Sequence, residues 1–223
     1  MHVPPMCACG NIFRGKTLAS VSKNLFSVAG KTALITGGGS GIGGFMAQSL
    51  ADEGASILLV GRREDKLKEV LGGRDGSIFV IDLSEAGASQ RLFKMVTDRG
   101  YQPDIIVNAA GINPRLHADE IDEDMWNYTV HLNLNVPFLV AQKFVPAMQA
   151  NRWGRIINIA SMQSSRAFPN GISYGAAKGG VTQLTRAMAE AWSALGVTAN
   201  ALAPGFFPTD LTSALFADPK TAA

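Results

Sequence analysis

Short apolar runs alternate with longer amphipathic stretches along most of this chain. The runs are rich in Ile, Val and Leu and have the length of buried strands, at residues 31–36, 56–60, 77–81, 104–107, 155–160 and 197–202. Apolar residues recur at three- and four-residue steps between them, which is typical of helices, at 41–53, 64–71, 85–99, 125–148 and 174–195. The alternation predicts an α/β fold: a Rossmann-type, doubly wound parallel sheet covered by helices in three layers.

The periodic pattern begins after the first 27 residues, which are rich in Pro, Gly and Ser. We expect residues 1–27 to form a flexible extension and residues 28–223 to form a single domain. The first acidic residue is Asp52, so the chain starts basic and rich in hydroxyl groups. That start fits either a disordered extension of a cytoplasmic protein, which we favour, or a mitochondrial presequence.

Composition excludes several classes of function. The net charge is +2, and no basic cluster with interleaved aromatic residues predicts a nucleic-acid partner. No apolar run is long enough to predict a membrane span. Cys7 and Cys9 are one residue apart, so they cannot hold the fold together, and no His/Cys set predicts a metal site. The hydrophobic fraction of 47% and the charged fraction of 17% suit a soluble globular protein.

A glycine-rich turn follows the first predicted strand and opens the first predicted helix. It reads Thr-Gly-x-x-x-Gly-x-Gly over residues 36–43. Glycines permit a tight turn and close approach of a pyrophosphate, whose negative charge the helix N-terminus favours. We expect the dinucleotide phosphates to meet Gly37, Ser40, Gly41, Ile42 and Gly43, with Ser40 adding its hydroxyl.

The end of the second predicted strand indicates the type of dinucleotide. An NAD site usually has an acidic residue there to bind the ribose hydroxyls. This chain has Gly61, followed by Arg62 and Arg63. Two guanidinium groups could clasp a 2′-phosphate, and no carboxylate would repel it. We therefore expect NADP(H) to be favoured over NAD(H); the alternative is a solvated basic pair in a loop.

Tyr174 and Lys178 are four residues apart on a predicted helix, so their side chains share one face. A nearby ammonium lowers the pKa of a phenol, which would let Tyr174 transfer protons near neutral pH. Ser161 precedes Tyr174 by thirteen residues, at the end of an apolar run, and its hydroxyl could hold a substrate oxygen. The alternative is an aromatic ring and a lysine stem that merely pack together.

With the glycine turn, the Tyr-x-x-x-Lys pair resembles the short-chain dehydrogenase/reductase family, over roughly residues 25–215. The resemblance implies that Tyr174 is the acid or base, Lys178 also binds the nicotinamide ribose, Ser161 fixes the substrate oxygen and Asn133 orders a relay water. Pro137 has no N–H and would leave the Asn133 carbonyl unpaired in a kinked helix. The resemblance also implies cofactor contacts after the later strands, from Asp82, Leu83, Asn108, Ala109, Gly111, Pro204, Gly205, Phe207 and Thr209.

The segments 161–164 and 203–212 look like those of the gluconate 5-dehydrogenase subgroup, which interconverts sugar acids and keto-acids. We expect Arg115 to bind a substrate carboxylate, and Gln163 to contact the substrate beside Ser161. Arg115 could equally be a surface residue of a loop. The alternative substrates are 3-oxoacyl thioesters, and the alternative of another class is a non-catalytic NADP(H)-binding sensor or scaffold.

The family usually has a seventh strand and a C-terminal segment, which this sequence lacks. We expect a C-terminally truncated domain whose sixth strand forms the edge of the sheet. We also expect self-association through the two long helices, at about residues 125–150 and 172–195, and at most a dimer.

Overall fold

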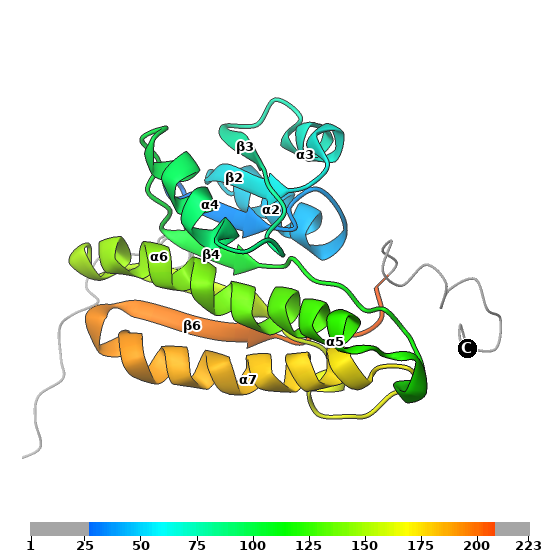
Figure 1. The fold of residues 1–223 in the computed structure, drawn as a ribbon. Coiled ribbons are helices and arrows are strands. Elements are labelled where there is room, and N and C mark those ends of the chain that lie inside the picture. Colours follow the sequence, from blue (N-terminus) through cyan, green and yellow to red (C-terminus); the bar gives the residue numbers. More distant parts are fainter. Residues whose placement is uncertain (1–26, 208–223) are drawn as a thin grey trace, which may run out of the picture.

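A computed structural model describes residues 27–207 and shows a six-stranded parallel sheet (Figure 1). Its strands run in the order β3-β2-β1-β4-β5-β6, and every neighbouring pair is parallel. They are β1 (Thr32–Thr36), β2 (Ser56–Gly61), β3 (Gly76–Val80), β4 (Ile105–Asn108), β5 (Gly154–Ile159) and β6 (Val197–Leu202). The predicted Rossmann-type fold is confirmed. The proposed N-terminal extension lies outside the described residues, apart from its last position.

Helices cover both faces of the sheet (Figure 1). On one face, α2 (Gly41–Asp52) and α3 (Glu64–Leu71) pack against β1 and β2. On the other, α4 (Ala88–Thr97), α6 (Val136–Ala150) and α7 (Ile172–Trp192) contribute to a second hydrophobic cluster. A shorter helix, α5 (Glu123–Val130), contacts α7. Within the described residues, β3 and β6 form the edges of the sheet.

The two clusters follow from the alternation of side chains along each strand. In β1, Ala33 and Ile35 point into the cluster with α2 and α3, whereas Leu34 points into the cluster with α4, α6 and α7. In β2, Ile57 and Leu58 divide in the same way. These residues are fully buried, and burying one such side chain contributes about 1.5–3 kcal/mol. The strands are therefore apolar throughout because both faces are covered.

The predicted helix over residues 125–148 was wrong in one respect. It is divided into α5 and α6 by a π-helical turn at His131–Asn135. The N–H of Val136 donates to the His131 carbonyl, and Pro137 lies in the first turn of α6. The wider turn places Pro137, which has no N–H to donate, at a helix start rather than in a helix interior. Asn133 lies in the middle of this turn.

Candidate active site

The predicted cofactor motifs lie at or after the carboxyl ends of strands, whereas Asn133, Tyr174 and Lys178 lie on helical segments. Because the sheet is parallel, these ends lie along one edge, where open α/β sheets bind ligands. The glycine turn follows β1, Arg62 and Arg63 follow β2, and the remaining groups follow β3 to β6. The structure therefore brings the motifs to one edge of the sheet, with the exception of Thr209, which lies outside the described residues.

The glycine turn is shaped so that side chains would not fit. Gly37 and Gly41 have φ angles of 68° and 52°, which L side chains rarely adopt. A Cβ on Gly43 would lie 2.4 Å from the Gly37 carbonyl oxygen, and one on Gly37 would lie 2.8 Å from the Ala110 nitrogen. Ser40 precedes the first turn of α2 without capping it by its side chain. The backbone here fits the close approach of a pyrophosphate.

Thr36 was given no role from the sequence, but it joins two parts of the site. Its Oγ1 accepts hydrogen bonds from the backbone N–H groups of Ala109, at 3.1 Å, and Ala110, at 3.2 Å. The glycine turn after β1 and the turn after β4 are thus held together. In the sequence, the threonine directly before the glycine turn is the feature that could have indicated this role.

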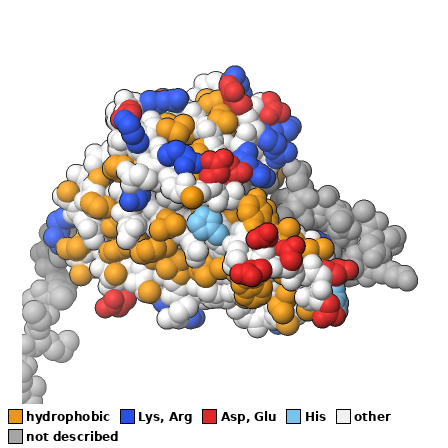
Figure 2. All heavy atoms as spheres, viewed as in Figure 1, with side chains coloured by type: hydrophobic (Ala, Val, Ile, Leu, Met, Phe, Trp, Pro, Cys, Tyr) orange, Lys and Arg blue, Asp and Glu red, His pale blue; other side chains and the backbone are white. Residues whose placement is uncertain are grey.

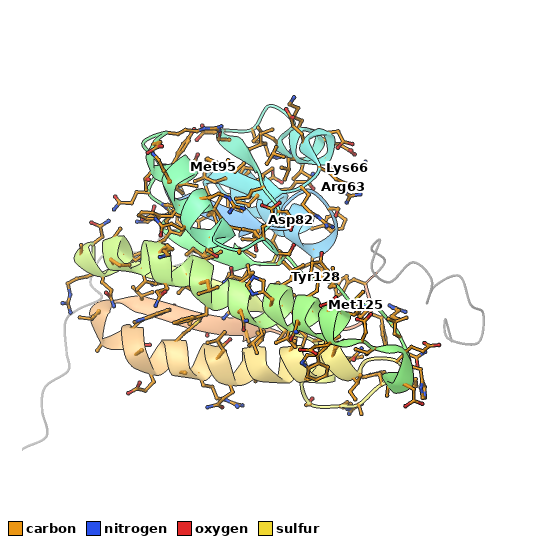
Figure 3. All side chains as sticks on the ribbon, in the orientation of Figure 1. Arg63, Lys66, Asp82, Met95, Met125 and Tyr128 are labelled. Carbon is orange, nitrogen blue, oxygen red and sulfur yellow. The ribbon has the colours of Figure 1, made fainter. Side chains whose placement is uncertain are left out.

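The basic residues after β2 lie beside two other predicted cofactor residues. Arg62 forms an ion pair with Asp82 at 3.5 Å, and Arg63 donates to the Ser40 hydroxyl at 3.3 Å. Figure 3 shows Arg63 and Lys66 together near α3, with Asp82 on the side toward the centre of the molecule. Burial acts to raise the pKa of Asp82, but hydrogen bonds from Ser84 and the charge of Arg62 outweigh it and lower that pKa. The corner combines exposed cations with one ionised carboxylate.

Two predicted cofactor residues have side chains that point into the protein. Leu83 is buried in the hydrophobic core. The Asn108 side chain is 3% exposed, and its Nδ2 donates to the Pro137 carbonyl and to Asn158 Oδ1, at 3.2 and 2.8 Å. A buried amide takes such partners because leaving it unpaired is costly. The Leu83 side chain and the Asn108 Nδ2 are therefore used within the protein, while Asn108 Oδ1 is buried without a hydrogen-bond partner among the described residues.

Ser161, Tyr174 and Lys178 come together between β5 and α7. Ser161 follows β5, and its side chain lies close enough to Tyr174 to act to lower the pKa of the phenol. Tyr174 and Lys178 are 8% and 5% exposed. The Lys178 ammonium lies 5.6 Å from the centre of the Tyr174 ring and donates to the Ile159 carbonyl at 2.6 Å. Burial lowers the pKa of Lys178 to about 8.

Lys178 was predicted to lower the pKa of Tyr174, and the structure does not show this effect. Burial raises the pKa of Tyr174 above its usual value; the hydrogen bond with Ser161 and the charge of Arg115 act against this but do not outweigh it. The Lys178 ammonium donates to the Ile159 carbonyl, and burial disfavours its charged form. In this structure, Ser161 and Arg115 are the groups that favour the phenolate.

Asn133 is fully buried and holds one unused acceptor. Its Nδ2 donates to the carbonyls of Ile112 and Thr129, both at 2.9 Å. Its Oδ1 has no hydrogen-bond partner within the described residues. A Cβ on Gly111 would lie 2.4 Å from this oxygen and 3.8 Å from the Lys178 ammonium, so both polar atoms face the same glycine. A buried acceptor in this position fits a bound water.

The predicted substrate residues lie on both sides of Ser161 and Tyr174. Arg115 has a φ angle of 54°, and its backbone N–H donates to Asn113 Oδ1 at 3.3 Å. The backbone N–H of Gln163 donates to Ser161 Oγ at 3.1 Å, while its buried Oε1 has no hydrogen-bond partner within residues 27–207. A cavity of about 660 Å³ is lined by residues 116–118, 163–172, 175 and 176. Gln163 lines this cavity, whereas Arg115 influences Tyr174 from the neighbouring loop.

The segment after β6 supplies the last predicted cofactor residues. Pro204 is half-buried, whereas Gly205 and Phe207 are exposed. The neighbouring Phe206 packs edge-on against Phe168, with ring centres 6.1 Å apart. This contact joins the segment to the loop between Ser161 and Tyr174.

On the face that Figure 2 shows, Lys and Arg side chains gather on the upper part, over the region of β2, α3 and α4. A band of hydrophobic side chains runs below them along α6, and Asp and Glu side chains gather at the lower right. No group of three metal-ligating side chains occurs within residues 27–207. None of the helices in this range is long and apolar enough to span a membrane.

Comparison with known proteins gives one consistent family. The family described as "short chain dehydrogenase" matches residues 31–220. Gluconate 5-dehydrogenase of Gluconobacter oxydans is 36% identical over 201 residues, which cover 87% of this chain and 78% of that protein. A 3-oxoacyl-[acyl-carrier-protein] reductase of Vibrio cholerae is 32% identical over 198 residues, covering 88% of this chain and 81% of that protein.

A solved structure shares the fold closely. It is a gluconate 5-dehydrogenase from Burkholderia cenocepacia in complex with NADP and tartrate. Its TM-score is 0.83 at 37% identity, with 90% of this chain and 80% of that chain covered.

Proposed function

The chain belongs to the short-chain dehydrogenase/reductase family, whose members are NAD(P)-dependent and act on CH–OH groups, and we propose that it interconverts a sugar acid and the corresponding keto-acid with NADP(H). The observation that carries the proposal is the arrangement of Ser161, Tyr174 and Lys178 between β5 and α7, with Arg115 close enough to influence the pKa of Tyr174. A phenol that can transfer a proton, a hydroxyl that can hold the reacting oxygen and a cation that can bind a carboxylate are then within one site.

The roles of the side chains follow from their positions. NADP(H), when bound, supplies or accepts the hydride. In ketone reduction Tyr174 gives its proton to the substrate oxygen, while Ser161 holds that oxygen beside the phenol. The Lys178 ammonium lies next to Tyr174 and can hold a ribose hydroxyl. Asn133 Oδ1 offers an acceptor for a water that resupplies the proton.

The substrate class rests on Arg115 and on the relatives. Its guanidinium is close enough to Tyr174 to act on the pKa of the phenol, so a carboxylate bound there would lie near the reacting carbon. One similar structure holds NADP together with tartrate, which carries carboxylates and hydroxyl groups. These facts favour a hydroxy acid over a 3-oxoacyl thioester.

The cofactor preference rests on the corner formed by Ser40, Arg62 and Arg63. β2 ends at Gly61, and the two arginines follow it. A 2′-phosphate would meet two cations and a hydroxyl there, although Arg62 must share its charge with Asp82. Several similar structures contain NADP.

The test is a panel of carbonyl compounds mixed with NADPH or NADH, with absorbance at the nicotinamide band as the readout. The panel holds 5-keto-D-gluconate, acetoacetyl-coenzyme A and a neutral ketone, and 2-dehydro-3-deoxy-D-gluconate is tested separately with NADP+ or NAD+, because its 5-hydroxyl would be oxidised. We expect turnover of the keto-acid with NADPH. Turnover of the thioester alone would establish the reductase alternative, and binding of NADPH without any turnover would establish the sensor or scaffold.

A further inference from the structure

The turn after Ser161 is attached to α7 through one side chain that has no assigned role. This 3-10 turn, η3 (Met162–Ser164), ends at Ser164. The Ser164 hydroxyl accepts from the backbone N–H of Ser161 at 3.2 Å and donates to the Lys178 carbonyl at 2.8 Å. One hydroxyl therefore connects the backbone of Ser161 with the backbone of Lys178.

We propose that Ser164 is a positioning residue that fixes Ser161 relative to the Tyr174–Lys178 face of α7 and so sets the rate of proton transfer. The proposal rests on the proposed function, because it assumes that these three side chains act on a carbonyl oxygen. Ser164 itself does not need to touch substrate or cofactor.

The surroundings of Ser164 leave few other ways to hold the turn. Ser161 Oγ accepts from the N–H of Gln163 at 3.1 Å, which orders the turn internally but not against α7. The turn lies against a face of α7 without side chains: a Cβ on Gly175 would be 3.7 Å from the Gln163 carbonyl, and one on Gly179 would be 3.7 Å from the Ser164 carbonyl. Glycines at these two positions offer no side chains that would hold η3 at one position along α7. A hydrogen bond has a preferred distance and angle, so the bond from Ser164 to the Lys178 carbonyl fixes that position.

The position of Ser161 matters for the chemistry of Tyr174. A misplacement of about 1 Å in a catalytic arrangement can cost on the order of 100-fold in rate. The Ser161 hydroxyl also acts to lower the pKa of Tyr174, together with the charge of Arg115. The charged groups facing Tyr174 are Arg115 from the loop after β4 and Lys178 from α7. If Ser161 is displaced, Arg115 and Lys178 stay in place, but the effect of the Ser161 hydroxyl on the pKa of Tyr174 is lost.

The experiment compares variants of the full chain in ketone reduction with NADPH, using the panel member that the wild type reduces fastest. Ser164→Ala should lower kcat by on the order of tenfold, with the KM for NADPH changed by less than about twofold. As pH rises, Lys178 titrates first, at about pH 8, and Tyr174 later; the later step, the alkaline limb that belongs to Tyr174, should move to higher pH. Ser164→Thr keeps the hydroxyl and should retain most of the activity. Valine has the shape of threonine but no hydroxyl, so Ser164→Val should behave like Ser164→Ala.

One neighbour provides a matched control. Thr182 Oγ1 also donates to the Lys178 carbonyl, at 3.2 Å, but within residues 27–207 it forms no hydrogen bond with Ser161. Thr182→Ala should leave kcat within about twofold of the wild type. An equal loss in Thr182→Ala would show that only the carbonyl of Lys178 matters and would overturn the proposal.

Other outcomes also decide the question. Equal rates for Ser164→Thr and Ser164→Val, or a loss in Ser164→Ala without movement of the alkaline limb, would make Ser164 merely structural and contradict the proposal. If Ser164→Ala does not fold, the comparison of kcat between Ser164→Thr and Ser164→Val still tests whether the hydroxyl is needed. Absence of turnover by the wild type with every panel member would refute the proposed function and this inference together, whereas normal turnover in all Ser164 variants would refute the inference alone.

Discussion

Lys178 gives the sharpest physical prediction because a buried ammonium makes stability depend on pH. Burial lowers the pKa of Lys178 from 10.5 to about 8 in the folded protein. In the unfolded chain the side chain is solvated and keeps its ordinary pKa. Between these two values the unfolded state binds more protons than the folded state, so the free energy of unfolding rises with pH. Below about pH 8 both states carry the proton, and the cost of burying the charge is at its full value.

The magnitude follows from the difference between the two pKa values. Each pKa unit corresponds to about 1.4 kcal/mol, so the full effect is about 3 kcal/mol, most of it gained between pH 7 and pH 10. The neutral amine can still donate to the Ile159 carbonyl, so this hydrogen bond is not lost as the proton leaves. Lys178→Met removes the titration and loses the hydrogen bond at every pH. Other titrating groups contribute equally to both proteins.

Urea unfolding without cofactor, followed by tryptophan fluorescence at several pH values, measures this difference. Between pH 7 and pH 10 the wild type should gain about 2–3 kcal/mol relative to Lys178→Met. Lys66→Met is the control that should stay flat in this window, because a hydrogen bond and the charge of Glu69 raise the pKa of the exposed Lys66 above 10.5, so its contribution to stability is lost only at higher pH. Parallel stability curves for the wild type and Lys178→Met would refute the reasoning.

Three further predictions concern cofactor, chemistry and substrate. Arg62→Ala should weaken NADPH binding by about 1.5–3 kcal/mol, the scale of a hydrogen bond to a charged group, and barely change NADH binding; equal affinities of the wild type for both cofactors, measured by fluorescence titration, would contradict this. Tyr174→Phe should abolish turnover but keep NADPH binding, because the ring remains and the proton is lost; substantial residual activity would remove Tyr174 from its proposed role. Arg115→Ala should raise the KM for keto-acids and leave neutral ketones unaffected, and an equal change for both substrates in steady-state kinetics would exclude a carboxylate contact.

Most of the fold could be predicted because the strands are buried on both faces. Continuous apolar runs then fix the positions of strands to within about a residue, as for β1, which was predicted at residues 31–36 and lies at Thr32–Thr36. The π-helical turn at His131–Asn135 was not predicted as such. Its apolar spacing resembles that of an ordinary helix, and only the hydrogen bond from Val136 to His131 distinguishes it.

The motifs indicated which residues gather at the site, but not where each side chain points. Asn108 and Lys178 both follow the predicted pattern along the chain, yet their partners are Pro137, Asn158 and the Ile159 carbonyl. These partners come from other strands and helices, so only the packed structure determines them. The same holds for Ser164, whose hydroxyl donates to the carbonyl of Lys178, fourteen residues further along the chain.

Two polar groups at the centre of the site reduce the stability of the folded chain. Lys178 is buried where its charged form is disfavoured, and Asn133 Oδ1 is buried without a partner among the described residues. A core built for stability alone would place apolar side chains at these positions, since an unpaired buried polar group costs about 1–3 kcal/mol. Both groups face Gly111, whose missing side chain leaves room between them. Buried polar groups around an open position are arranged to receive the polar atoms of a ligand, and their cost in stability is the physical argument that this site is functional.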